Sequence, residues 1–365
     1  MPIYMDLHIV PGVKANDVAE AHRMDVLIQD EHECKCMTYW VDESRGHIFC
    51  LIDAPGKDMV IELHNKAHGL VPHKIIEVQT SLVESFLGRI TDPEDATLNS
   101  NGLKLLTDPS FRILLVIQLE DLVLLQAYHG KERGNELLRR CRQLINDQLY
   151  DHGGVEAEHE GSAIIASFTS AAQAVRCAIA IREQADVEGE DSPGLRIGLS
   201  AGEPVTANKK LFGDTIELAE RICFIANNRK TGISSNMKEL VAKDHFQNNG
   251  QSIFTLSPQD EDFLNLLFES LNKNWQETEF DMEDYCHTMA MSKSQLYRKT
   301  VALTGFSPNL LLKEFRLQKA KELLRKNHSN ISQVGFDSGF SSPSYFTKCF
   351  KKKYGILPGA YVEML

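Results

Sequence analysis

GFSSPSYFTKCFKKKYGILPGAY, residues 339–361, places a turn directly before a basic helix. Its opening Gly-Phe-Ser predicts the turn, and Ser342 followed by Pro343 is typical of the first turn of a helix. We expect a short helix over residues 331–338, just before this stretch. A short helix, a turn and a second helix with a polar face together predict a helix-turn-helix unit.

The same arrangement occurs once more, earlier in the chain. Asp281 begins a short helix, a turn follows, and Ser292 caps a polar helix. A long amphipathic helix over residues 309–326 connects the two units. We expect two recognition helices in adjacent major grooves of DNA, about one helical turn apart. The candidate DNA-contacting side chains are Lys293, Ser294, Gln295, Tyr297 and Arg298 in the first helix, and Ser342, Ser344, Tyr345, Thr347, Lys348 and Lys351 in the second.

Charge separates this end of the chain from the rest. The chain has a formal net charge of −12. From Met289 to Leu365 there are 13 Lys/Arg and four Asp/Glu, a net charge of +9, so the remaining residues carry −21. Lysine and arginine contact phosphates without regard to base sequence. The distribution therefore favours a polyanion-binding domain attached to an acidic body.

These residues resemble the AraC/XylS family of transcription regulators, most clearly over 339–352 and 354–361. The resemblance covers residues 259–365 and implies an all-α double helix-turn-helix domain that binds double-stranded DNA. Two positions depart from the family pattern. Gly335 replaces a usual alanine, which costs about 1 kcal/mol of helix preference, and Val362 replaces a usual arginine.

The N-terminal segment, residues 1–80, alternates strand and helix patterns. Residues 3–9 alternate apolar and polar side chains, which predicts a strand with Met5 and Leu7 on its one buried face. We expect a helix capped by Asn16, strands over 36–41 and 47–52, a helix over 57–68 and a last strand over 74–78. The order βαββαβ is that of an α+β ferredoxin-like domain.

Seven of the 13 histidines lie in the first 73 residues. His64 and His68, four apart, share one helix face, as metal-binding pairs do. Imidazole and thiolate ligands suit nickel, zinc or copper. On spacing alone, ordinary surface residues remain the alternative. One difficulty concerns His8. If the helix with His64 and His68 packs on the Met5 face of the first strand, His8 points to the other side of the sheet and cannot easily join the pair. The candidate metal ligands are His8, His64, His68, Cys34 and Cys36.

A resemblance favours the metal hypothesis. Residues 4–8, 19–22, 39–42, 49–51 and 64–69 resemble a family of small ferredoxin-like proteins described as nickel-binding. The match spans the whole N-terminal segment. It implies a transition metal ion, nickel first, as the cofactor.

The middle segment, residues 111–245, has a mixed α+β pattern. Strands over 113–119, 164–168 and 195–200 alternate with helices over 122–150, 171–184 and 215–226. The segment resembles a class III nucleotidyl cyclase domain, most clearly over 195–203 and 211–221. Such domains pair head to tail, so the resemblance implies a homodimer.

The residues that carry cyclase chemistry in that family are altered here. Glutamates replace the two metal-binding aspartates, the lysine that selects the purine and the asparagine that orients the ribose. Only the arginine that stabilises the transition state is kept. Glutamate is one methylene longer than aspartate, which displaces metal ions that must be placed closely. These positions are Glu120, Glu160, Glu156, Glu217 and Arg221. We therefore expect a degenerate cyclase site without enzymatic activity. An intermediate hypothesis is that the former nucleotide pocket senses a ligand.

Together these patterns predict a multidomain protein. There is no run of about 18 apolar residues and no secretory leader, and the eight cysteines are scattered, which predicts a cytoplasmic protein without a membrane segment. The predicted function is a sequence-specific DNA-binding transcription regulator, controlled by metal or small-ligand binding to its N-terminal or middle domain. The alternative is a residual nucleotidyl cyclase or a nucleotide-responsive switch fused to a DNA-binding domain.

Overall fold

The computed structural model of the 365-residue chain describes residues 1–157, 163–187, 194–226, 230–241, 253–326 and 330–365. These residues form two compact units. The first contains residues 1–116, 149–176 and 199–219, and the second contains residues 117–148, 177–198 and 220–365. Each unit is described by itself.

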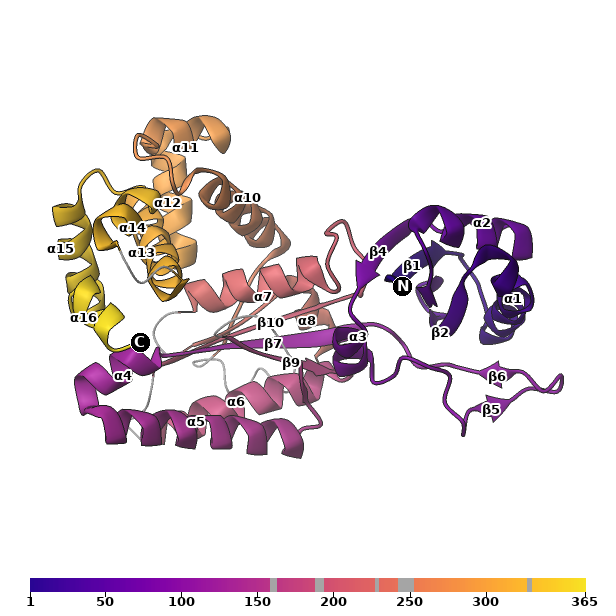
Figure 1. Ribbon diagram of the computed structural model, residues 1–365. Coiled ribbons are helices and arrows are strands. Elements are labelled where there is room, and N and C mark those ends of the chain that lie inside the picture. The colour runs from indigo at the N-terminus through magenta and orange to yellow at the C-terminus, as the bar shows by residue number, and fades with distance from the viewer. Residues whose placement is uncertain (158–162, 188–193, 227–229, 242–252, 327–329) are drawn as a thin grey trace. The chain divides into compact units, whose positions relative to one another are not determined.

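The first unit begins with a four-stranded sheet of order β2-β3-β1-β4. Its strands, all in antiparallel pairs, are β1 (Ile3–Ile9), β2 (Lys35–Asp42), β3 (His47–Asp53) and β4 (Lys74–Val78). The helices α1 (Ala15–Ile28) and α2 (Lys57–Ala67) pack on one face of this sheet (Figure 1). The predicted βαββαβ order is confirmed.

Two details of the predicted N-terminal strand and helix are wrong. The helices cover the face of β1 that carries Asp6 and His8, and the opposite face, with Met5, is buried as well. Helix α1 begins one residue before Asn16, because the side chain of Asp17 accepts a hydrogen bond from the backbone N–H of Lys14 at 3.1 Å. The apolar/polar alternation was misleading because the side chains buried under the helices include the polar Asp6 and His8.

Residues after β4 pack onto the same unit. They include α3 (Thr80–Leu87) and a hairpin of β5 (Thr97–Leu98) and β6 (Lys104–Leu105). Residues 92–109 are rich in Pro, Gly, Asn and Asp, which is typical of a linker. Leu106, however, is only 3% exposed and belongs to the core under α1 and α2. The hydroxyl of Tyr39 donates a hydrogen bond to the carbonyl of Lys104 at 2.9 Å. The hairpin is therefore part of the N-terminal fold.

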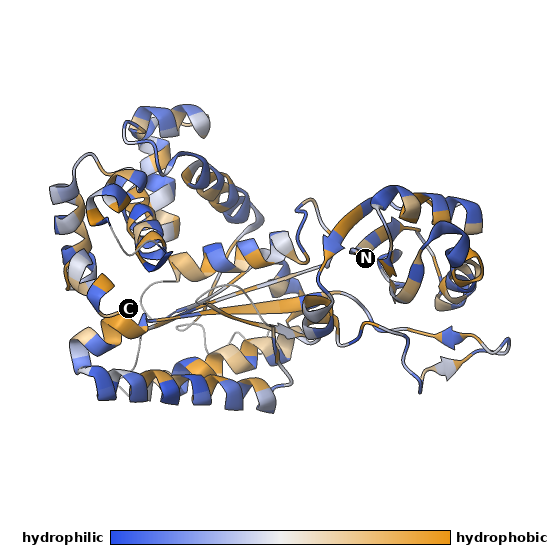
Figure 2. Ribbon diagram, in the orientation of Figure 1, coloured by the Kyte–Doolittle hydropathy of each residue, from blue (hydrophilic) through white to orange (hydrophobic). Residues whose placement is uncertain are grey.

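The middle of the chain contains a six-stranded sheet of order β12-β11-β10-β7-β9-β8. Its strands are β7 (Arg112–Leu119), β8 (Val155–Ala157), β9 (Ala163–Phe168), β10 (Leu195–Gly202), β11 (Thr231–Ile233) and β12 (Ile253–Thr255). Figure 2 shows β7 in the hydrophobic colour, as expected of a strand buried on both faces. The helices are α4 (Leu122–His129), α5 (Lys131–Asp151), α6 (Ala171–Val187), α7 (Gly213–Ile225) and α8 (Ser235–Leu240).

The second unit ends in a series of helices. They are α10 (Pro258–Asn274), α11 (Met282–Thr288), α12 (Lys293–Thr304), α13 (Pro308–Lys326), α14 (Ile331–Asp337), α15 (Pro343–Tyr354) and α16 (Pro358–Glu363). Their order agrees with the two predicted helix-turn-helix units joined by a long helix. Among the described residues, no helix is both long enough and apolar enough to cross a membrane.

Candidate nucleic-acid interface and metal centre

The first helix-turn-helix unit consists of α11, a turn and α12. Ser292 is the N-cap of α12: its side chain accepts a hydrogen bond from the backbone N–H of Gln295 and so satisfies a free donor of the first turn. The turn passes through Ala290, whose φ of 48° lies in the left-handed region. Leu296 and Thr300 are fully buried beneath α12. The opposite face of α12 is exposed and carries the five predicted residues Lys293, Ser294, Gln295, Tyr297 and Arg298.

The second helix-turn-helix unit consists of α14, a turn and α15. Ser342 is the N-cap of α15 and accepts a hydrogen bond from the backbone N–H of Tyr345. Phe346 and Phe350 are completely buried, so they anchor the helix. Of the six residues predicted for this helix, Ser344, Tyr345, Lys348 and Lys351 are exposed, and Ser342 and Thr347 are half-buried.

Two basic side chains of these helices already have acidic partners. The ammonium group of Lys293 lies 2.6 Å from a carboxylate oxygen of Glu283 in α11. The Lys353 ammonium forms an ion pair with Glu314 in α13. The carboxylate of Glu314 therefore competes with any phosphate for Lys353. Lys348 and Lys351 stay exposed.

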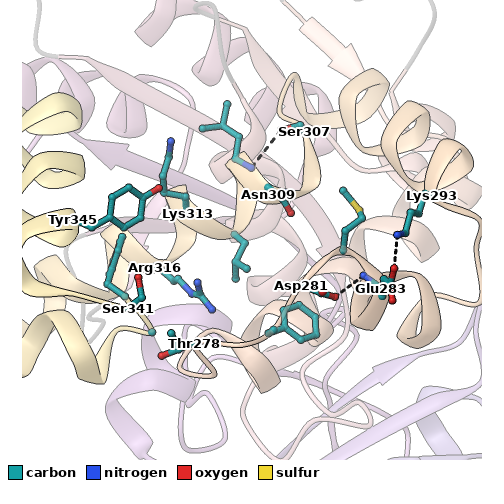
Figure 3. Close-up of a pocket in the computed structure, with 16 residues that line it drawn as sticks. Thr278, Asp281, Glu283, Lys293, Ser307, Asn309, Lys313, Arg316, Ser341 and Tyr345 are labelled. Atoms are coloured by element: carbon teal, nitrogen blue, oxygen red, sulfur yellow. Dashed lines mark hydrogen bonds and ion pairs between the residues drawn. The ribbon is translucent and has the colours of Figure 1, made fainter.

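A groove of about 750 Å³ lies between the beginnings of the two recognition helices (Figure 3). Lys293 of α12 and Tyr345 of α15 lie along it, together with Lys313 and Arg316 of α13. Helix N-termini and basic side chains are the groups that contact DNA phosphates. The carboxylates of Asp281 and Glu283 also line this groove, so its lining contains both signs of charge.

A second candidate site lies in the first unit, between β1 and the two helices that cover it. Asp6, His8, Cys50 and His64 form one group, and Asp25, His64 and His68 form another. Within each group the potential ligand atoms lie within 4.8 Å of one another. The predicted histidines His8, His64 and His68 thus come together, with 4.8 Å between the ring centroids of His8 and His64. The expected separation of His8 from the pair is wrong, because α2 packs on the His8 face of β1.

His64 is held between two carboxylates. Its Nε2 lies 2.8 Å from Oδ2 of Asp6, and its Nδ1 lies 3.1 Å from Oδ1 of Asp25. Burial alone would favour the neutral ring, but the charges of Asp6 and Asp25 and their hydrogen bonds raise the pKa of His64 to about 10. Burial likewise opposes ionisation of Asp6 and Asp25, yet the neighbouring histidines hold the pKa of each carboxyl below its usual range.

The donor set fits a borderline transition metal. His8 is 3% exposed, and within the described part of the chain neither of its ring nitrogens has a hydrogen-bond partner. Its Nε2 lies 3.4 Å from Asp6. Buried polar atoms without partners are costly unless a ligand satisfies them. The cluster offers imidazole nitrogens, carboxylate oxygens and one thiol sulfur as donors. Nickel, zinc and copper accept such a mixed set.

The predicted cysteine pair lies outside both groups. Cys34 is buried, and its thiol donates to the carbonyl of His32 at 3.2 Å. Cys36 is half-buried beside Asp25, and burial raises the pKa of its thiol. Cys50, which we did not predict, joins the first group because it pairs with Asp6 across β1 and β3. Asp25 was also missed; its position at the end of α1 gives no sequence signal for this role.

Three of the five predicted cyclase-site residues have partners within the protein. In the second unit, a carboxylate oxygen of Glu120 accepts from the backbone N–H of Gly194 at 3.3 Å, and Arg221 donates to the side chain of Asn265 at 2.6 Å. In the first unit, Glu217 accepts from Asn208 at 2.7 Å. Glu156 lies on β8 and is exposed. Glu160 lies outside the described residues.

Comparisons with known families agree with the two ends of the chain. Residues 285–364 match the family described as "Helix-turn-helix domain", and residues 4–78 match "Nickel responsive protein SCO4226-like". These matches coincide with the paired recognition helices and with the histidine cluster. Residues 285–364 therefore carry a helix-turn-helix domain. The two models leave residues 79–284 uncovered, so the cyclase resemblance of the middle segment stays a prediction.

Two curated relatives and one solved structure give the scale of these similarities. "Histidine kinase P4" of Formosa agariphila is 38% identical over 110 residues, 30% of this chain and 8% of that protein. "HTH-type transcriptional regulator MtrA" of Neisseria gonorrhoeae is 34% identical over 85 residues, 23% of this chain and 28% of that protein. The structure of SCO4226 from Streptomyces coelicolor is 27% identical, with a TM-score of 0.20, and covers 21% of this chain and 94% of that one. The chain therefore spans under a third of the length of these two curated relatives.

Proposed function

We propose that this protein is a sequence-specific DNA-binding transcription regulator that contacts double-stranded DNA with α12 and α15. The observation that carries the proposal is the pair of serine-capped helices, each with a buried apolar side and an exposed polar side. Arg298 and Lys348 are exposed on these helices. Base edges would be contacted from the exposed faces, and phosphates from lysines and helix N-termini.

DNA binding is tested with duplexes that the full-length protein selects from a random-sequence pool. We expect the Arg298→Ala variant to lose about 1–3 kcal/mol of affinity on the selected site, because an arginine that contacts guanine has two hydrogen bonds to lose. Lys319→Ala is the matched control, since Lys319 pairs with Glu322 on α13. Affinity for DNA should also fall steeply as salt rises. Failure to select any duplex would overturn the proposal.

We further propose that the N-terminal domain binds a transition metal, nickel first, and that this binding controls the regulator. His8, His64 and His68, with Asp6, Asp25 and Cys50 beside them, would hold the ion. A divalent ion held there would supply positive charge to offset the buried carboxylates of Asp6 and Asp25. The residues themselves connect β1, α1, β3 and α2, so metal binding would stiffen the whole N-terminal sheet and its helices.

The metal proposal is tested by titrating Ni²⁺ into the full-length protein. We expect His8→Ala and His64→Ala each to weaken binding by at least about tenfold, in the range seen for loss of groups around metal sites. His129→Ala is the control, because His129 is exposed at the end of α4. Unchanged affinity in both site variants would remove these histidines from the site.

For the middle segment we propose a non-catalytic pairing domain. Support comes from the cyclase resemblance and from the glutamates at the positions that would bind metal and nucleotide. A homodimer at micromolar concentration, measured by sedimentation, is the expected result. Cyclic nucleotide formed from ATP or GTP with Mn²⁺ would favour the residual cyclase instead.

A further inference from the structure

One arginine of the DNA-binding domain is bonded to the backbone that precedes the first helix-turn-helix unit. Arg316 lies in α13, the helix that connects the two units. Its Nε donates to the carbonyl of Trp275 at 2.7 Å, and its Nη2 donates to the carbonyl of Glu277 at 2.6 Å. Both carbonyls belong to the loop that joins α10 to α11, so the guanidinium attaches this loop to α13.

The turn of the second helix-turn-helix unit, between α14 and α15, approaches the same loop from the other side. Gly339 has a φ of +76°, and a Cβ on it would lie 2.3 Å from the carbonyl oxygen of Trp275 and 2.8 Å from Nε of Arg316. Only glycine permits both this backbone conformation and this close approach. In addition, the side chain of Gln276 donates to the carbonyl of Asp337 at 3.1 Å.

We propose that Arg316 is a positioning residue that holds the two recognition helices at the separation and orientation that DNA requires. The proposal rests on the proposed DNA-binding function. Arg316 connects the loop before the first unit with α13, and the loop in turn meets the turn that begins the second recognition helix. The guanidinium suits this task, because its donors leave in fixed directions and can satisfy two carbonyls at once.

A direct contact with DNA is the competing role for this side chain. Arg316 lines the groove between the recognition helices, where Lys313 also lies (Figure 3). A phosphate contact needs positive charge, which lysine would retain. A positioning contact needs two donors aimed at two carbonyls, which lysine cannot reproduce. The Arg316→Lys variant therefore separates the two roles.

The experiment uses the full-length protein and a duplex that the wild-type protein selects from a random-sequence pool. The two half-sites are mapped by protection from cleavage, and a second duplex carries one extra base pair between them. That insertion rotates one half-site by about 35° relative to the other, because the helical repeat is about 10 base pairs. The measured quantities are the affinity ratio between the two duplexes and the salt dependence of binding.

We expect the wild-type protein to bind the longer duplex at least about tenfold more weakly. Arg316→Lys and Arg316→Ala should both reduce this ratio to about threefold or less, with an unchanged salt dependence. Gly339→Ala should do the same, because its Cβ would push the Trp275 carbonyl away. Lys313→Ala is the contrast: it should keep the wild-type ratio whatever it does to affinity.

A wild-type ratio in Arg316→Lys would overturn the proposal, and so would a salt slope lowered by about 0.9 in Arg316→Ala, which indicates one lost phosphate contact. Far-ultraviolet circular dichroism identifies any variant that fails to fold. In that case Arg316→Lys and Gly339→Ala still decide the question. If the wild-type protein selects no duplex at all, it is the DNA-binding function that fails.

Discussion

His64 illustrates how burial among charges changes a residue beyond its sequence. An ordinary histidine titrates near 6.5, so a metal site built on ordinary histidines loses affinity as the pH drops through that value. Between Asp6 and Asp25, however, the pKa of His64 is raised to about 10. At neutral pH the ring is therefore protonated, and a metal ion must displace a proton to bind it.

The first prediction concerns this proton. Because His64 binds metal only as the neutral ring, Ni²⁺ affinity should rise about tenfold per pH unit from pH 6.5 to 8.5, well below the raised pKa. Calorimetry in buffers of different ionisation heat should show about one proton released per ion. In Asp25→Asn, where His64 has lost one carboxylate, the proton release should be smaller. Affinity that is flat above pH 7 would contradict a protonated His64.

The same groups determine how pH affects the metal-free fold. His64 has a raised pKa, so its contribution to stability is fully present below about 6.5 and is lost as the pH rises through about 10. The pKa values of Asp6 and Asp25 are lowered, so their contribution is present above about 3.9 and is lost as the pH falls further. The N-terminal domain should therefore be most stable between about pH 3.9 and about pH 6.5.

At the scale of single elements, Ser342 has two roles that one pair of variants can separate. Ser342→Ala removes the hydrogen bond to the backbone N–H of Tyr345 and should lower the free energy of unfolding by about 1 kcal/mol. Ser342→Asp restores a capping oxygen but adds negative charge at the start of the recognition helix. It should retain stability in urea unfolding and yet weaken DNA binding. Equal stability of the alanine variant would show that the cap is dispensable.

Elements with strong local signals could be predicted from sequence, whereas contacts between distant elements could not. The serine caps and periodic apolar residues located α12 and α15 within a few residues. The apolar run at β7 was equally clear. Asp25 and Cys50 were missed as members of the metal cluster, because only the packing of α1, α2 and β3 brings them to Asp6 and His64. Gly335 departs from a family pattern; a Cβ there would lie 3.0 Å from the Phe346 ring, so glycine permits close packing of α14 on α15.

At the scale of the whole second unit, the helix-turn-helix domain is attached to α4. Val123 and Leu124 of α4 belong to the same apolar core as Phe350 and Tyr361. Asp121, the N-cap of α4, also accepts from the hydroxyl of Tyr361 at 2.8 Å. The carboxylate has two cationic partners as well: Arg325 at 2.8 Å and Lys321 at 3.1 Å.

Removing this carboxylate should therefore be costly. Asp121→Ala leaves two cations without their buried partner, and we expect a loss of about 3 kcal/mol in the free energy of unfolding. Asp121→Asn keeps a capping oxygen and should lose less. Glu322→Ala, which removes an exposed ion pair on α13, is the control and should cost under about 1 kcal/mol. Comparable small losses in all three variants would mean that α4 and the DNA-binding domain are not coupled through Asp121.

The N-terminal sheet has a consequence for how this protein can be divided. Its two helices cover only the face that carries Asp6 and His8, yet Met5, Trp40, Phe49 and Leu51 are fully buried on the other face. Residues after 78 must supply that cover, and the guanidinium of Arg89, 4.8 Å from the Trp40 ring centroid, is one part of it. A fragment cut where the family match ends would present a water-exposed apolar surface and should aggregate or pair with itself. We therefore expect residues 4–78, which match a family model on their own, to depend on later residues of this chain for folding.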